Sequence, residues 1–385
     1  MSLKRARIIS YVSQPLGKEE VPGLDVEERL ELVMRNTVEV IRPEELRSLL
    51  ETESEPKAYW GFECSGPMHL GMGLVCGQKI LDMVKAGFGF TILLADWYAW
   101  INNKLGGDME KIRLAGEYFK ECFQALGLRG PRVRYVWTSD VVSDPEYWRR
   151  VITIAKSATL RRVRRALPIM GRSLDATDVE TAWLFYPCMQ AADIFHLDVH
   201  VACAGIDQRR VHMLARDVAE KMGWRKPVCL HTPLLMSLSG PEEGIEGVFD
   251  EDERLNKRIR SKMSKSVAGG CIFVHDEPEE IRSKMRKAFC PARQVEDNPV
   301  LEIARLIIFP RLGRLDVDRP EKFGGPVSYE SYAELEKDFV SGSLHPLDLK
   351  NAVAEALVEI LKPVRERLAK KPEMLEVIKE AEVTR

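Results

Sequence analysis

The segment KMSKS at residues 262–266 holds the side chains of this chain best suited to chemistry, with two lysines and two serines in five residues. It follows a basic run that contains Lys257, Arg258 and Arg260. Ammonium and hydroxyl groups bind phosphate oxygens, and lysine neutralises the charge that develops on a departing pyrophosphate. The segment therefore predicts a loop that covers a polyphosphate. The alternative is a solvated basic surface loop.

A second candidate phosphate site lies far upstream, in the segment SGPMHLGMG at residues 65–73. An apolar run at 58–62 predicts a strand before it, and apolar periodicity from about 74 to 86 predicts a helix after it. A glycine-rich turn between strand and helix receives anions, because backbone N–H groups and the helix dipole point at the ligand. His69 adds a donor there, although taken alone it would be an ordinary turn histidine.

Three polar side chains share one face of an otherwise apolar predicted helix. Tyr186, Gln190 and Asp193 are spaced i, i+4 and i+7, which places them within about 60° of arc on an α-helix. Burying such groups without partners costs about 1–3 kcal/mol each. The face therefore predicts a polar binding pocket, and the alternative is a solvent-facing stripe. The loop at 204–210 follows a predicted strand, and its Asp207 is suited to accept from ribose hydroxyls.

The elements that position these segments alternate along the chain. Predicted helices lie at 26–40, 43–52, 111–126 and 146–165, and further predicted strands at 90–95, 133–138, 198–204 and 227–231. This alternation indicates a Rossmann-like parallel α/β sheet, which binds ligands at the carboxyl ends of its strands. We expect an N-terminal extension with helices (1–50), a Rossmann-like catalytic domain (51–310) and an all-α C-terminal domain (311–385).

Composition limits the class of protein. The 385 residues are enough for two domains. The 57 basic and 59 acidic residues nearly cancel, so overall charge argues neither for nor against nucleic acid. Eight cysteines without a CxxC pair predict reduced thiols in a cytoplasmic protein, with no structural zinc or other metal site. No apolar stretch reaches the roughly 18 residues of a membrane span, so we expect no membrane association.

Together, the segments 65–73 and 262–266 resemble the HIGH and KMSKS signatures of class I aminoacyl-tRNA synthetases. The second signature matches in full. In the first, Met72 stands where the family often has its second histidine, and the stretch 69–79 is one residue longer than is usual in the family. The resemblance implies a Rossmann-like enzyme that binds ATP, with Mg²⁺ on the phosphates, between the two segments.

The same resemblance implies catalytic roles. His69, Lys262 and Lys265 would stabilise the transition state in which the carboxylate of an amino acid attacks the α-phosphate of ATP. The implied ATP-binding residues are Gly71, Gly205, Asp207, Lys262, Met263, Ser264, Lys265 and Ser266.

The motifs YPxMQxxD at 186–193 and GxDQRxxH at 205–212 are similar to those of tyrosyl-tRNA synthetases of the archaeal and eukaryotic type. The resemblance runs from about 57 to 362 and is weaker at 240–259, which looks like an insertion. It implies a homodimer that joins tyrosine to tRNA(Tyr), with Asp193 bonded to the phenolic hydroxyl. The implied tyrosine-binding residues are Tyr59, Gly61, Tyr186, Gln190, Asp193 and Gln208.

The resemblance also implies a surface for tRNA. Arg165, Arg209 and Arg210 match residues that contact the first pair of the acceptor stem, and arginine suits phosphates and base edges. Phe323 and Asp348 match residues that stack on and recognise the first anticodon base. Without the resemblance, the arginines are equally a solvated helix end, and Asp348 is an ordinary loop residue or helix cap.

Two alternatives remain beside a tyrosine–tRNA ligase. Tryptophanyl-tRNA synthetase shares the fold and both signatures, but indole offers no hydroxyl to Asp193. An RNA-binding paralogue without aminoacylation is the alternative of another class, and the intact 262–266 segment weighs against it.

Overall fold

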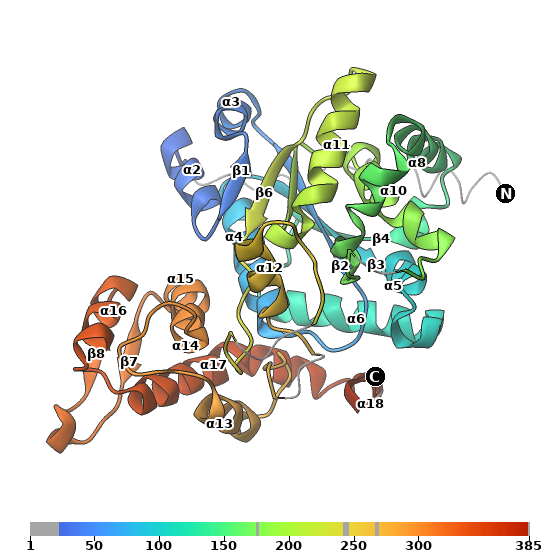
Figure 1. Ribbon diagram of the computed structural model, residues 1–385. Helices are drawn as coiled ribbons and strands as arrows, with labels where there is room; N and C mark the ends of the chain where they lie inside the picture. Colours follow the sequence, from blue (N-terminus) through green and yellow to red (C-terminus); the bar gives the residue numbers. More distant parts are fainter. Residues whose placement is uncertain (1–22, 175–176, 242–245, 266–268, 384–385) are drawn as a thin grey trace.

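The computed structural model describes residues 23–174, 177–241, 246–265 and 269–383. In these ranges six strands form one sheet in the order β1-β6-β5-β2-β3-β4. Helices flank the sheet, and a mostly helical C-terminal part lies beside it (Figure 1). The strands are β1 (Glu39–Ile41), β2 (Lys57–Glu63), β3 (Gly89–Ala95), β4 (Val133–Trp137), β5 (Val201–Gly205) and β6 (Val228–Thr232). All but β1 run parallel, which confirms the predicted Rossmann-like class.

Helices cover both faces of the sheet. One face carries α2 (Val26–Met34), α3 (Pro43–Thr52), α4 (Gly77–Lys85) and α6 (Met109–Ala125); the other carries α5 (Asp96–Ile101), α7 (Thr138–Val141), α8 (Pro145–Ser157), α9 (Leu160–Arg164), α10 (Thr181–His196) and α11 (Arg209–Met222). Successive side chains of a strand point to opposite faces. Trp60 and Ile92 therefore join the first layer, while Tyr59 and Leu93 join the second. Burial on both sides explains why these strands read as continuous apolar runs.

The order of the strands creates an opening beside β2. The chain adds β3 and β4 on one side of β2 and then returns to place β5 and β6 on the other side. The connections that leave β2 and β5 therefore diverge at their carboxyl ends, which is the place where open α/β sheets bind ligands.

A π-helix, η1 (Gly71–Cys76), precedes α4 where the sequence predicted the start of an ordinary helix. A π-helical turn takes up one residue more than an α-helical turn and is frequent at functional sites. A turn of this kind would take up the additional residue that the resemblance predicts in the 69–79 stretch.

Two predicted helices are shorter in the structure. The helix expected at 26–40 ends at Met34, and β1 follows as an antiparallel edge strand on β6, because Val38 N–H donates to the carbonyl of His231 at 2.9 Å. The helix expected at 146–165 is two helices. Ala158 has an extended backbone, and Thr159 caps the second helix by accepting from the N–H of Arg162.

The C-terminal part is not purely helical, so the prediction of an all-α domain was wrong in this respect. From residue 311 its helices are the end of α15 (Phe309–Leu312), α16 (Tyr332–Ser341), α17 (Pro346–Leu368) and α18 (Pro372–Val383), and the preceding chain forms α13 (Pro278–Lys287), α14 (Pro299–Ile303) and the π-helix η5 (Ala304–Ile308). They are joined by an antiparallel ribbon of β7 (Leu315–Val317) and β8 (Val327–Tyr329). Strands of three residues are too short to give a periodic signal.

Helix α17 packs along α6 and attaches the C-terminal part to the sheet domain (Figure 1). Arg367 of α17 and Lys371 both form ion pairs with Glu121 of α6, at 2.5 and 2.9 Å. Among the described residues, no helix has the length and apolar character needed to cross a bilayer.

Candidate active site

A cavity of about 430 Å³ opens at the carboxyl ends of β2 and β5. Its walls come from β2, the turn before η1, α10, the loop after β5 and the segment 262–265. The structure brings together here the predicted residues Tyr59, Gly61, His69, Gly71, Tyr186, Gln190, Asp193, Gly205, Asp207, Gln208, Lys262, Met263, Ser264 and Lys265. Ser266 lies outside the described residues.

Asp193 forms the buried end of the cavity, with 1 % of the residue exposed. Tyr98 donates its hydroxyl to Oδ2 at 2.6 Å, and Tyr147 donates to Oδ1 at 2.9 Å. Burial raises the pKa of Asp193 to about 7, although both hydroxyl bonds act to lower it. A carboxylate has about four acceptor positions, so it can accept a third hydroxyl from a ligand in the cavity.

Amide and phenol groups line the wall between the two ends. Gln190 donates to the side-chain oxygen of Gln208 at 3.2 Å, and Gln208 donates to the carbonyl of Ile169. Tyr186 donates to the carboxylate of Glu63 at 3.3 Å. These contacts fix the orientation of the polar face of α10, so the groups are prearranged for the ammonium and carboxylate of an amino acid.

Two lysines lie at the open end. Lys262 pairs with Asp207 at 2.7 Å, and the ammonium of Lys265 donates to the carbonyl of Ser65. The adjacent Met263 is 2 % exposed and anchors the segment in the core. Desolvation of the ammonium, with the nearby charge of Lys104, lowers the pKa of Lys265 to about 8. Residue 265 as a whole is exposed to solvent. Its ammonium can therefore exchange the carbonyl oxygen of Ser65 for a phosphate oxygen.

His69 faces the same end of the cavity as a neutral donor. Burial and the charges of Lys262 and Lys265 lower the pKa of its imidazole to about 4. Its Nδ1 is buried and has no hydrogen-bond partner among the described residues. Gly71 packs against the ring, where a Cβ would lie 3.1 Å from two ring atoms, so a side chain at 71 would push the imidazole aside. Such an unpaired buried nitrogen is suited to a ligand oxygen.

The family described as tRNA synthetases class I (W and Y) matches residues 51–243 and 256–362. The tyrosine–tRNA ligase of Aeropyrum pernix is 50 % identical over 94 % of this chain and 99 % of its own length. The crystal structure of tyrosyl-tRNA synthetase with L-tyrosine from Pyrococcus horikoshii has a TM-score of 0.84, at 43 % identity, over 93 % of this chain and 100 % of its own.

The chain belongs to the tyrosyl-tRNA synthetase family. A tryptophanyl-tRNA synthetase from Aeropyrum pernix is 18 % identical over 88 % of this chain and 84 % of its own, with a TM-score of 0.63, and so shares the fold alone.

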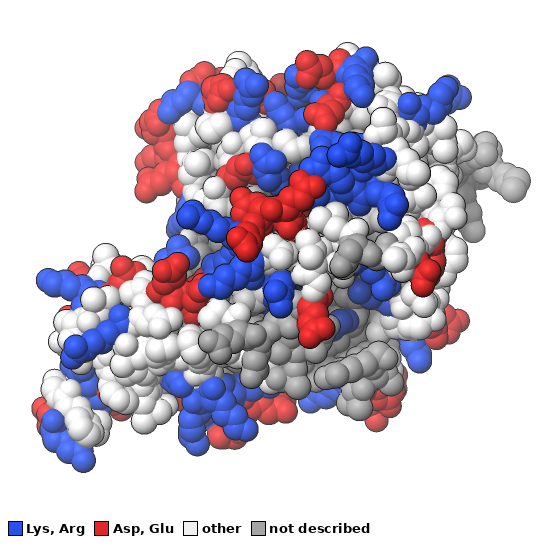
Figure 2. Space-filling view, in the orientation of Figure 1, with Lys and Arg blue, Asp and Glu red and all other residues white. Residues whose placement is uncertain are grey.

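The tRNA-binding residues expected from that family lie in two other places. Arg165, Arg209 and Arg210 line a second cavity of about 510 Å³, which borders the first because Asp207 lines both. Figure 2 shows lysines and arginines gathered on this face beside a group of acidic side chains. Phe323, 59 % exposed, and Asp348 belong to the C-terminal part.

Sequence reasoning missed three side chains of the active site. Glu63 ends β2 and also accepts from Asn102 at 2.8 Å; its place at a strand end was a usable signal. Tyr98 lies in α5, just beyond β3, and its place after a strand end was a similar signal. Tyr147 gave no signal, because it reaches Asp193 from a helix 46 residues away in sequence.

Proposed function

We propose that this member of the tyrosyl-tRNA synthetase family is a tyrosine–tRNA ligase. The supporting observation is a single cavity with a buried carboxylate, Asp193, at one end and two lysines with a neutral histidine at the other. An amino acid with a phenolic hydroxyl fits the first end and a triphosphate the second. Tyrosine and ATP would give tyrosyl-adenylate and pyrophosphate, and the tyrosyl group would pass to the terminal ribose of tRNA(Tyr).

The first step needs no covalent enzyme intermediate. The polar face of α10 holds tyrosine so that its carboxylate attacks the α-phosphate, and the bond to pyrophosphate breaks. His69, Lys262 and Lys265 bond phosphate oxygens whose charge increases in the transition state. Lys262 must leave Asp207 to do so, which frees that carboxylate for the ribose hydroxyls. Backbone N–H groups at Gly71 and Gly205 complete the nucleotide contacts.

Mg²⁺ would accompany ATP, bound mainly through the phosphates, since magnesium keeps several waters and takes few protein ligands at nucleotide sites. Among the described residues, no group of three or more His, Cys, Asp or Glu side chains is arranged to hold a metal. Bound Mg²⁺ would supply charge neutralisation on the phosphates, and the residues above would position them.

ATP–pyrophosphate exchange with each of the twenty amino acids tests this function. We expect exchange with tyrosine and none above background with tryptophan or phenylalanine. Exchange with tryptophan alone would identify the tryptophanyl alternative. Absence of exchange with every amino acid, in a protein that still binds tRNA, would identify an RNA-binding paralogue.

The C-terminal part from about 311 to 385 is proposed to bind the anticodon. Asp348 lies in the first turn of α17, and Phe323 precedes the turn Gly324-Gly325. Arg319 joins the two regions by donating to the carbonyls of Gly325, at 2.8 Å, and Ser343, at 2.7 Å. An exposed aromatic ring and a carboxylate at the start of a helix, on segments joined by Arg319, suit an unstacked base.

Replacing Asp348 by alanine should reduce kcat/KM for tRNA(Tyr) about 10- to 100-fold, because one bidentate base contact is worth about 1–3 kcal/mol. Tyrosine activation should be unchanged, since Asp348 is remote from the cavity. Aminoacylation and pyrophosphate exchange, measured on the same preparation, separate the two steps. Asp316→Ala, an exposed carboxylate on β7, is the matched control. Loss of both activities in Asp348→Ala would assign the residue to folding instead.

We further propose that the protein is a cytoplasmic homodimer. None of the eight cysteines forms a disulfide, as in proteins of reducing compartments. Large apolar side chains are exposed on the helices that cover one face of the sheet, and such patches are typical of protein contacts. They are Trp100, Ile152, Leu160 and Phe185.

A further inference from the structure

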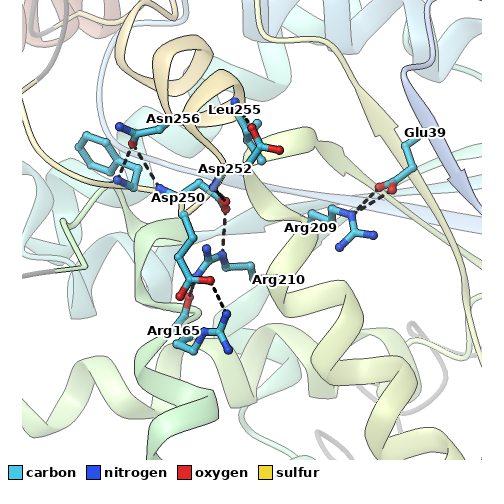
Figure 3. Close-up of polar contacts among 10 residues, drawn as sticks. Glu39, Arg165, Arg209, Arg210, Asp250, Asp252, Leu255 and Asn256 are labelled. Atoms are coloured by element: carbon cyan, nitrogen blue, oxygen red, sulfur yellow. Dashed lines mark hydrogen bonds and ion pairs between the residues drawn. The ribbon is translucent and has the colours of Figure 1, made fainter.

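An acidic segment, Asp250-Glu251-Asp252, contacts two members of the arginine cluster formed by Arg165, Arg209 and Arg210 (Figure 3). Arg210 pairs with Asp250 at 2.9 Å, and Arg165 pairs with Glu251 at 2.6 Å. Arg210 also donates to the carbonyl of Arg165 at 2.9 Å, so the two arginines and two carboxylates form one connected group.

Capping of the next helix explains only part of this segment. Asp252 is the N-cap of α12 (Glu253–Arg260) and accepts from the N–H groups of Arg254 and Leu255. Asp250 and Glu251 have no such role. Asp250 uses Oδ1 for the N–H of Asp252 and directs Oδ2 at Arg210. The Asp250 pair is also the more protected, with side chains 14 and 17 % exposed, against 61 and 44 % for the pair of Glu251 with Arg165.

Arg209 provides the contrast within the cluster. Its Nε donates to both oxygens of Glu39 at 2.9 Å, and Glu39 is held by the buried His231 at 2.8 Å. Figure 3 shows its terminal nitrogens directed away from Glu39. This pair joins α11 to β1, with side chains 43 and 28 % exposed, and leaves one side of the guanidinium available. Asp250 and Glu251, by contrast, come from a surface segment.

The acidic segment is also outside the pattern common to the family. The family matches residues 51–243 and 256–362, and Asp250-Glu251-Asp252 falls in the interval between these ranges. The arginines, in contrast, lie inside the matched ranges. The carboxylates that cover the arginines therefore come from a stretch that the family pattern does not include.

We propose that Asp250 and Glu251 act as an intramolecular substitute for RNA phosphates. Their carboxylates hold the arginine cluster in the free enzyme, and the acceptor end of tRNA displaces them. The inference rests on the proposed function, which places the acceptor stem on this cluster. A phosphate and a carboxylate bind the same kind of guanidinium donors and therefore compete for them. Apparent affinity for tRNA is then reduced by the fraction of enzyme in which the segment is closed.

Such a substitute raises selectivity. A short or weakly bound polyanion contacts too few arginines to displace the two carboxylates, whereas tRNA also gains contacts with the rest of the protein. The closed segment also connects directly, through α12, to Lys262. Displacement of the segment by tRNA therefore occurs one helix away from the loop that handles ATP.

The test is direct binding of tRNA(Tyr) to the full-length double variant Asp250→Asn, Glu251→Gln. We expect Kd to fall about three- to tenfold, the factor that two partly exposed ion pairs supply. The gain should shrink as salt is raised, since screening weakens the closed state. Tyrosine activation should be unchanged. Glu27→Gln, Glu220→Gln is the matched control, because it adds the same two units of charge at surface ion pairs elsewhere.

Weaker tRNA binding in the double variant would overturn the proposal, because it would mean that the carboxylates position the arginines for RNA. Binding equal to that of the control variant would overturn it as well. Glu251→Gln alone, at an exposed side chain, gives the same test with a smaller gain if the double variant folds poorly. Absence of tyrosine activation in the wild-type protein would instead reject the proposed function.

Hydrogen exchange of the wild-type enzyme supplies a second measurement. The N–H of Asp252 donates to Asp250, and the N–H groups of Phe249 and Asp250 donate to Asn256. If tRNA displaces the segment, exchange at Asp252 should become faster on addition of tRNA(Tyr). Slower exchange there would show that the segment contacts RNA in place, and would contradict displacement.

Discussion

Replacing Asp193 by alanine should lower the preference of the enzyme for tyrosine over phenylalanine by about 10- to 100-fold, as kcat/KM in pyrophosphate exchange. The carboxylate is buried and has a free acceptor position toward the cavity. A site built to bond a hydroxyl rejects the analogue that lacks it, a rule whose standard example is tyrosyl-tRNA synthetase itself. Loss of one such bond costs about 1–3 kcal/mol, which gives the stated factor. The change in preference should come mainly from a lower kcat/KM of Asp193→Ala for tyrosine.

Controls must separate recognition from folding, because Asp193→Ala also leaves the hydroxyls of Tyr98 and Tyr147 without their acceptor. Asp193→Asn keeps an oxygen and the side-chain volume, and should likewise lose discrimination. Tyr147→Phe removes one contact to Asp193 but leaves the cavity wall intact, and should keep most of the preference. A Tyr/Phe ratio unchanged in Asp193→Ala would show that another group recognises the hydroxyl.

The pKa of Asp193 gives a check on the folded state of these variants. The buried carboxyl titrates at about 7, whereas an unfolded aspartate titrates near 3.9. The folded protein therefore holds this proton to higher pH, and its stability falls as pH rises from about 4 to about 7. Asp193→Asn has no carboxyl at this position and lacks this pH dependence of stability. The Tm of Asp193→Asn relative to wild type should thus increase over the same pH range.

Replacing Lys265 by alanine should lower kcat for tyrosine activation about 10²- to 10³-fold, the usual effect of removing one preorganised contact to transition-state charge. The ammonium already lies at the open end of the cavity, against the carbonyl of Ser65. Lys257→Ala is the matched control, because this exposed lysine of α12 does not reach the cavity. It pairs instead with Asp297 at 2.7 Å. A decrease of less than twofold in Lys265→Ala would exclude Lys265 from the chemical step.

The pH dependence tests the same residue independently. Desolvation lowers the pKa of Lys265 to about 8 in the free enzyme, and only the ammonium form binds phosphate. We therefore expect kcat/KM for ATP to decrease as pH rises through about 8. Lys265→Arg keeps a positive charge at all these pH values and should lack this decrease while retaining part of the activity. A decrease that persists in Lys265→Arg would assign the titration to another group.

Local sequence patterns carried much of the fold and of the site. The strands β2 to β6 lie where apolar runs predicted them, since burial on both faces leaves a continuous signal. The i, i+4, i+7 spacing of Tyr186, Gln190 and Asp193 placed them on one helix face. The secondary-structure prediction was wrong at β1, β7 and β8, because these strands are too short to show a periodic pattern. It also missed the break between α8 and α9, because the helical pattern is similar on both sides of that break.

The sequence by itself determined which residues could do chemistry, and its resemblance to class I synthetases grouped Lys262 and Lys265 with the turn at His69. Only the tertiary structure decided their partners: Asp193 with Tyr98 and Tyr147, Lys262 with Asp207, and the acidic segment on the arginines. Periodicity is local because it reflects the geometry of one helix or strand. A contact between residues 40 to 95 positions apart depends on how the whole sheet closes, and in a single sequence it leaves no pattern.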